Sequence, residues 1–181
     1  MIKNIISIIA GIITAFAISY STNEDALKNF RFNAGLYDTK YEEKALENTL
    51  KLFNKQFAVL FSTSDVGELK HMPAANLVRR RIVQEIRNWA INDQVLIYDK
   101  DFFEIEKIEL LSPKRAVVVA NEVWFMNVKS RKKRYEKSGD RINQIKVRYI
   151  LRKMGKRWEV IEYEVYGPDD SLPNLNEGVW S

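Results

Sequence analysis

The sequence predicts an α+β protein: an N-terminal membrane helix or signal, then two or three helices packed on one face of a twisted four-stranded antiparallel sheet. Three observations support this prediction. The chain opens with an uncharged apolar stretch, apolar residues then recur at steps of three and four, and strand-like segments fill the second half. With 181 residues, 46% of them hydrophobic, the chain is long enough to bury a core.

The apolar stretch follows Lys3 and runs uncharged from Ile5 to Ser19, before the acidic segment that contains Glu24. This layout is typical of an export signal, and residues 1–21 are therefore predicted to be a signal anchor or a signal peptide. The positive-inside rule keeps Lys3 in the cytoplasm. We expect a single pass through the inner (cytoplasmic) membrane with the C-terminal domain outside. The alternatives are a secreted or periplasmic protein cleaved near residues 19–21, or a buried helix of a soluble core.

Residues 22–38 are predicted to be a linker or a short helix, and residues 39–166 the α+β domain. Thr39 and Glu42 form a capping-box pattern at the start of an amphipathic helix that continues to about Phe61. Pro73 suits the first turn of a second helix, which carries an apolar stripe through Ala90.

Residues 102–111 and 116–128 are predicted strands, and the second is apolar on both faces, which is typical of a central strand. Residues 147–165 are predicted to be a hairpin centred on Gly155. The tail, residues 167–181, has no apolar period and is predicted to be extended.

The hairpin register follows from matching its charges. Centring on Gly155 places Arg148 opposite Glu162 and Lys146 opposite Glu164, two favourable cross-strand pairs. This register assigns one face to the core: Val147, Tyr149, Ile161 and Tyr163.

The other face of the hairpin carries an apolar corner of Ile150, Trp158 and Val160. With helices on one side of the sheet only, this corner is expected to be exposed and to bind a protein partner. The alternative is that a loop or the C-terminal tail covers it.

The hairpin pattern Y-x-L-x-x-x-G-x-x-W-x-V, formed by Tyr149, Leu151, Gly155, Trp158 and Val160, resembles the nuclear-transport-factor-like (cystatin-like, SnoaL-like) α+β cone superfamily. The resemblance covers roughly residues 39–166. The leader, linker and cone together are similar to the membrane-anchored periplasmic scaffold subunits of type IV secretion systems. Those scaffolds have an Asn-Pro-x-Gly loop before the last strand, and this sequence does not.

The resemblance also implies a pocket inside the cone, where enzymes of the superfamily place Asp, His, Tyr or Arg. The best candidates here are Asp99, Asp101 and Tyr149, each with an ordinary alternative as a solvated turn or plain core. Tyr98 is an equal candidate for pocket or core, and His71 lies in a polar connection. With one His and no Cys we expect no metal, and we expect no cofactor and no catalytic residue.

Residues 129–157 hold thirteen Lys or Arg against two acids, whereas residues 158–181 hold six acids and no base. The basic surplus is therefore local to one predicted loop: Lys129, Arg131, Lys132, Lys133, Arg134 and Lys137. This loop is either simply solvated or binds an acidic protein or anionic lipid head groups through residues 129–137. Nucleic acid is disfavoured because Tyr135 is its only aromatic residue.

These observations favour a membrane-anchored, non-catalytic extracytoplasmic binding module, a structural or assembly subunit of a multiprotein envelope complex such as a secretion system. Its expected partners are other protein subunits or further copies of itself. The expected contacts are the apolar corner, the basic loop and Trp180 in the tail. The alternative is an exported small-molecule-binding protein, or a lyase or isomerase that uses the cone pocket.

Overall fold

The computed structural model describes residues 23–130, 141–167 and 170. The chain divides into two compact units, Met1–Thr39 and Lys40–Ser181, each of which we describe by itself. The predicted apolar leader lies outside the described residues, and so does most of the predicted tail. Among the helices that are described, none is both long and apolar enough to cross a bilayer.

The first unit contains helix α2, Glu24–Asn33. The Asn23 side chain caps it by accepting a hydrogen bond from the Ala26 amide at 3.1 Å. Glu24 and Asp25 lie in the first turn, where their negative charge complements the positive end of the helix dipole.

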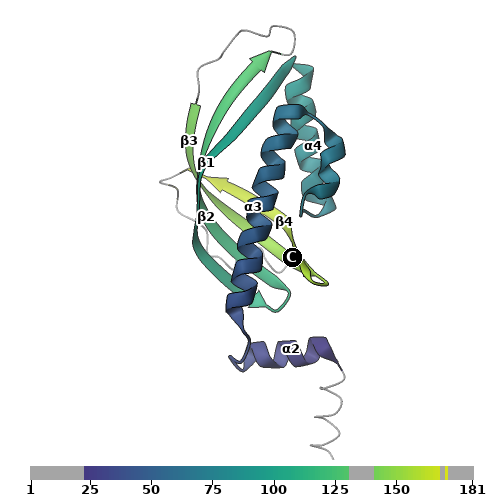
Figure 1. Cartoon of the computed structure of the whole chain (residues 1–181), viewed down its shortest axis with the longest axis vertical. Helices are drawn as coiled ribbons and strands as arrows, with labels where there is room; N and C mark the ends of the chain where they lie inside the picture. The colour runs from purple at the N-terminus through teal and green to yellow at the C-terminus, as the bar shows by residue number, and fades with distance from the viewer. Residues whose placement is uncertain (1–22, 131–140, 168–169, 171–181) are drawn as a thin grey trace, which may run out of the picture. The chain divides into compact units, whose positions relative to one another are not determined.

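The second unit confirms the predicted α+β class. Helix α3, Thr39–Thr63, starts at the residue where the sequence pattern predicted a helix start, and the sheet curves around it (Figure 1). The buried residues of α3 recur at the predicted helical spacing and include Leu46, Leu50, Phe53, Leu60 and Phe61. The 3-10 helix η1, Val66–His71, then leads to helix α4, Asn76–Ile91.

Helix α4 begins three residues later than predicted, at Asn76 instead of Pro73. The intervening backbone is extended and pairs with the last strand: the Ala75 amide donates to the Val160 carbonyl at 2.8 Å, and the Val160 amide donates to the Pro73 carbonyl at 2.9 Å. These bonds satisfy both backbone groups of Val160 on the outer edge of β4 and are made by extended backbone, so the helix starts only after Ala75.

The sheet is antiparallel with strand order β1-β2-β3-β4, formed by Gln94–Ser112, Arg115–Ser130, Arg141–Met154 and Arg157–Tyr166. The residues from Ala116 to Ala120 of β2 are buried on both faces, which confirms its central position. We call the face that packs on α3 and α4 the concave face; its core includes Val118, Val147 and Tyr149. The opposite, convex face has a small separate apolar cluster.

The predicted hairpin register is wrong. A two-residue turn at Gly155 and Lys156 pairs Met154 with Arg157, and a bulge then pairs Ile150 with Glu162 but Leu151 with Val160, leaving Ile161 without a partner. Gly155 has a φ of +61°, a conformation that suits glycine.

The bulge changes the ion pairs as well. Arg148 lies opposite Glu164, with 2.8 Å between its Nη1 and Glu164 Oε2. Lys146 pairs across the sheet with Glu106 of β1 at 2.9 Å. Neither Arg148–Glu162 nor Lys146–Glu164 is the observed cross-strand pair.

The prediction that Ile150, Trp158 and Val160 form an exposed corner is also wrong, because of the same bulge. One extra residue in β4 turns Trp158 and Val160 onto the concave face, where they are 2% and 0% exposed. Ile150 does face the convex side, but it is 3% exposed and packs with Val117 and Ile161. Ile161 therefore leaves the core face to which the sequence assigned it, whereas Val147, Tyr149 and Tyr163 occupy that face as predicted.

Candidate ligand-binding site

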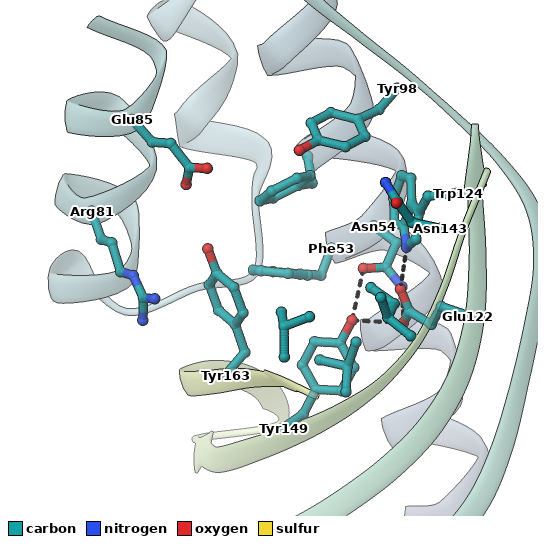
Figure 2. Close-up of a pocket in the computed structure, with 14 residues that line it drawn as sticks. Phe53, Asn54, Arg81, Glu85, Tyr98, Glu122, Trp124, Asn143, Tyr149 and Tyr163 are labelled. Atoms are coloured by element: carbon teal, nitrogen blue, oxygen red, sulfur yellow. Dashed lines mark hydrogen bonds between the residues drawn. The ribbon is translucent and has the colours of Figure 1, made fainter. Parts of the chain in front are cut away.

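A pocket of about 260 Å³ opens on the concave face, between α3, α4 and all four strands. We call it the concave pocket. Its walls are mostly aromatic and aliphatic, with a few polar groups from facing elements (Figure 2): Phe53, Asn54, Phe57, Arg81, Glu85, Tyr98, Glu122, Trp124, Asn143, Ile145, Val147, Tyr149, Tyr163 and Val165.

The floor of the pocket is a hydrogen-bonded network around Glu122, a carboxylate whose side chain is only 1% exposed. Its Oε1 accepts from the Asn54 amide at 2.9 Å and from the Tyr149 hydroxyl at 2.7 Å (Figure 2). Its Oε2 accepts from the Trp124 indole at 2.6 Å. Both oxygens are therefore engaged, which is how a buried carboxylate is tolerated.

Lys100 supplies a positive charge behind this network. Its Nζ lies 3.5 Å from Glu122 Oε1, and 4.0 Å and 5.0 Å from the ring centroids of Phe103 and Trp124. The contact with Glu122 is an ion pair without hydrogen-bond geometry. Burial lowers the pKa of Lys100 to about 8, although the Glu122 charge acts in the opposite direction.

The α4 side of the pocket presents a different set of polar groups. Arg81 and Glu85 are one turn apart, yet the Arg81 guanidinium lies over the Tyr163 ring at 5.1 Å instead of forming an ion pair with Glu85. The Glu85 carboxylate and the hydroxyls of Tyr98 and Tyr163 point into the same space (Figure 2). Within the described residues, none of these three groups has a hydrogen-bond partner.

The pKa values of these groups reflect their burial. Burial raises the pKa of the Glu85 carboxyl, and the nearby Arg81 charge partly opposes this. Burial and the negative charge of Glu85 raise the pKa values of Tyr98 and Tyr163 to about 12, so both hydroxyls stay protonated at neutral pH. At that pH the α4 side of the pocket offers two hydroxyls and one carboxyl.

The structure divides the sequence-predicted pocket candidates. Tyr98 and Tyr149 line the concave pocket. Asp99 is exposed and pairs with Phe125 on the convex face, and Asp101 is the exposed extra residue of a bulge in β1. His71 is exposed at the end of η1. The two aspartates and the histidine therefore do not belong to this pocket.

The predicted basic loop lies largely outside the described residues, namely Arg131, Lys132, Lys133, Arg134 and Lys137, and Trp180 of the tail does too. Lys129, which is described, is exposed near the end of β2.

Sequence reasoning missed Glu122, Asn54 and Glu85. A signal existed for Glu122, because it is the one charged residue from Ala116 to Val128, a run that is apolar apart from Asn121 and Asn127. A charge at a core position is retained in a fold only when partners satisfy it. Asn54 is a similar polar interruption, next to Phe53 in the buried stripe of α3. In the described part of the chain, no three His, Cys, Asp or Glu residues are placed to hold a metal ion.

The fold defines the class of this domain: an α+β domain with helices on one face of a four-stranded antiparallel sheet. A solved structure of this kind is the intermembrane-space region of the chloroplast protein ARC6, which superposes with a TM-score of 0.60 at 13% identity. The match covers 68% of this chain and 95% of that one. At so low an identity the likeness establishes a shared fold alone.

Two further solved structures, both of proteins of unknown function, are also similar. One, from Prochlorococcus marinus, is described as NTF2-like (19% identity, TM-score 0.34, 49% of this chain and 63% of that one). The other, from Nostoc punctiforme, is described as having a cystatin-like fold (12% identity, TM-score 0.41, 68% and 92%). Both descriptions use names of the superfamily that the hairpin pattern resembles. No protein-family model and no curated protein matches the sequence.

Proposed function

We propose that this protein is a membrane-anchored, non-catalytic binding module that takes a small ligand in its concave pocket. In this proposal residues 1–21 are the anchor and the α+β domain lies outside the cytoplasm, as a structural or assembly subunit of an envelope complex. The leader pattern supports the anchor. The shared fold with a chloroplast intermembrane-space region is in keeping with an extracytoplasmic place.

The observation that carries the binding role is the state of the carboxylate in the pocket. Glu122 has both oxygens occupied by donors from three different elements, α3, β2 and β3. A general base must present a free lone pair to the substrate proton, whereas three hydrogen bonds and the burial of this side chain leave little of the Glu122 carboxylate accessible. Glu122 therefore shapes the floor of the pocket, and a lyase or isomerase would have to use the other carboxylate of the pocket, Glu85.

The pocket itself has the features of a small-molecule site. It is concave, its walls are largely aromatic, and a few polar groups converge from α4, β1 and β4. Arg81 is exposed and Val165 is 56% exposed, so ligands have access from the solvent at these two residues.

Partner contacts remain part of the proposal, although the corner of Ile150, Trp158 and Val160 is no longer available for them. Within the described residues, the outer face of α4 is better suited: Leu77 is 74% and Ile91 81% exposed, and Arg80 and Arg87 are exposed between them. This face fits a protein subunit with an acidic surface. Binding of anionic lipid head groups through residues 129–137 remains a separate proposal.

Fractionation of the native protein tests the anchor. We expect the chain in the membrane fraction, with an N-terminal mass that includes Met1. A soluble chain that starts near Tyr20 or Thr22 would overturn the anchor and leave the binding role of the pocket intact.

A crosslinking experiment tests the partner face. A photo-reactive residue placed at Leu77 is expected to crosslink to another protein in membranes, whereas one placed at Leu52 of α3, which is 43% exposed, serves as the matched control. Equal crosslinking at both positions would contradict the assignment to α4.

A further inference from the structure

We propose that the concave pocket binds a small, neutral cyclic compound through a hydroxyl group, which donates a hydrogen bond to Glu85 and accepts one from Tyr98 or Tyr163. This inference rests on the proposed binding function of the pocket and adds the chemical class of the ligand.

The first step of the argument is that the described part of the protein supplies no hydrogen-bond partner to three polar groups at the α4 side, which leaves them to solvent or to a ligand. The Glu85 carboxylate accepts no hydrogen bond within the described residues, and the hydroxyls of Tyr98 and Tyr163 donate none there. All three groups converge on one space (Figure 2). A hydroxyl is both a donor and an acceptor, so a single ligand hydroxyl serves the carboxylate and one tyrosine together.

The second step is that the pocket is balanced in charge. The Arg81 charge acts on Glu85 from one turn away along α4, and Lys100 forms an ion pair with Glu122. A neutral ligand leaves this balance intact. An anionic ligand would place its charge next to the Glu85 carboxylate.

The third step argues against an organic cation. Aromatic pockets commonly bind cations over ring faces. Here the Tyr163 ring already has the Arg81 guanidinium over it at 5.1 Å, and the Trp124 ring has the Lys100 ammonium at 5.0 Å. A further cation on either ring would be repelled by a fixed positive charge nearby.

The apolar walls determine the rest of the ligand. Phe57, Trp124, Ile145 and Val165 offer aromatic and aliphatic surface but no charge. The volume of about 260 Å³ lies below the range of about 300 to 1,000 Å³ that is usual for drug-sized ligands. A compact ring system of one or two rings therefore fits better than a long chain.

Four naphthalene probes that share one ring system test this proposal: 2-naphthol, naphthalene, 2-naphthoate and 2-naphthylmethylammonium. Binding to the full-length chain in detergent is measured by calorimetry at pH 7. We expect 2-naphthol to bind about tenfold or more tightly than each of the other three, because only its head group is neutral and matches Glu85 and a tyrosine hydroxyl. Tighter binding of the naphthoate or the ammonium compound would overturn the inference.

Substitutions of the pocket residues test whether 2-naphthol binds at Glu85 and the two tyrosines. Glu85→Gln and the double variant Tyr98→Phe/Tyr163→Phe should each weaken 2-naphthol about tenfold and leave naphthalene unchanged. Glu162→Gln and Tyr41→Phe change the same residue types at exposed positions away from the pocket and serve as controls. Thermal unfolding of every variant verifies that it is folded. Equal weakening of 2-naphthol by the control variants would also overturn the inference.

The outcomes separate this inference from the proposed function. If 2-naphthol and naphthalene bind equally, the pocket binds ligands but the hydroxyl assignment is wrong. If none of the four probes binds, both the inference and the small-ligand function of the pocket fail.

Discussion

The Trp158 indole donates a hydrogen bond of 2.8 Å to Glu42 Oε2, and this contact joins the β3–β4 hairpin to the first turn of α3. Lys153 Nζ donates to the other oxygen of Glu42 at 2.5 Å and lies 5.6 Å from the Trp158 ring centroid. Two residues of the hairpin thus satisfy a carboxylate that is 4% exposed as a whole residue. Trp158 is therefore a structural residue.

Substitution of Trp158 should destabilise the domain. Trp158→Ala is expected to lower the free energy of unfolding by about 3–5 kcal/mol, because it removes a large buried ring. Trp158→Phe keeps an aromatic ring but removes the indole donor to Glu42 Oε2, at a cost of about 1–3 kcal/mol. Urea unfolding followed by circular dichroism measures both. Arg157→Ala, at the adjacent exposed position, is the control. An undiminished stability of Trp158→Ala would mean that the indole is not part of the core.

Loss of the Tyr149 hydroxyl should affect the floor of the pocket. Tyr149→Phe removes one of the donors to Glu122 Oε1, and the buried carboxylate then loses about 1–3 kcal/mol of hydrogen bonding. Tyr41→Phe, at a residue that is 71% exposed, should have no measurable effect. Chemical denaturation of the two variants compares them, and equal stabilities would show that the hydroxyl contributes nothing to the network.

The buried Lys100 should make stability depend on pH. Its pKa is 10.5 in the unfolded chain and about 8 in the folded protein. Between pH 8 and pH 10.5 the unfolded chain therefore binds more protons than the folded chain. The Lys100 contribution to the free energy of unfolding therefore rises with pH from about 8 upward, by at most about 1.4 kcal/mol per pH unit. Below pH 8 both states are protonated, and this contribution is constant.

Two tyrosines limit the useful pH window. The pKa values of Tyr98 and Tyr163 are raised from 10.0 to about 12 in the folded protein. Their contribution to the free energy of unfolding is therefore fully present below pH 10 and is lost as the pH rises from 10 to 12. Denaturation between pH 7 and 9.5 isolates the lysine. Lys100→Met should flatten the slope, and the exposed Lys107→Met should retain it. A slope that persists in Lys100→Met would assign the effect to another group.

The observed hairpin register can be tested by coupling energies. A double-mutant cycle of Arg148→Met with Glu164→Gln should give a coupling of about 0.5–3 kcal/mol, because these two side chains form the ion pair. The same cycle with Glu162→Gln should give a smaller value, since Glu162 pairs with Ile150. A larger coupling of Arg148 with Glu162 than with Glu164 would contradict the bulge and support the register predicted from the sequence.

The Glu164 carboxylate provides a second readout of that register. The Tyr166 hydroxyl, which donates to it at 2.6 Å, and the Arg148 guanidinium both lower its pKa. A carbon-detected NMR titration should show that Arg148→Met raises the pKa of Glu164.

Much of the fold follows from local pattern. The capping box at Thr39 and the apolar stripe through Phe61 predicted α3, and the two-sided apolar run from Ala116 predicted the central β2. The side-chain period of two also assigned Val147, Tyr149 and Tyr163 to the core, and it succeeded because an error of two residues in register leaves the face of each residue unchanged.

The candidate site did not follow in the same way. Glu122 was visible as a charge within an apolar strand, but its donors Asn54 and Tyr149 lie 68 and 27 residues away along the chain. Arg81 and Glu85 are four residues apart, a spacing that favours an ion pair on a helix, but the Arg81 guanidinium lies over the Tyr163 ring of a distant strand.

By itself, then, the sequence determined the α+β class, the long helix and the central strand, because these depend on periodicity within one segment. The tertiary structure alone decided the bulge at Ile161 and the burial of Trp158 and Val160. The physical reason is that Glu42 and the extended backbone of Pro73–Ala75 offer hydrogen bonds to that part of β4. The pattern of residues within the hairpin cannot predict these partners, because they come from distant parts of the chain.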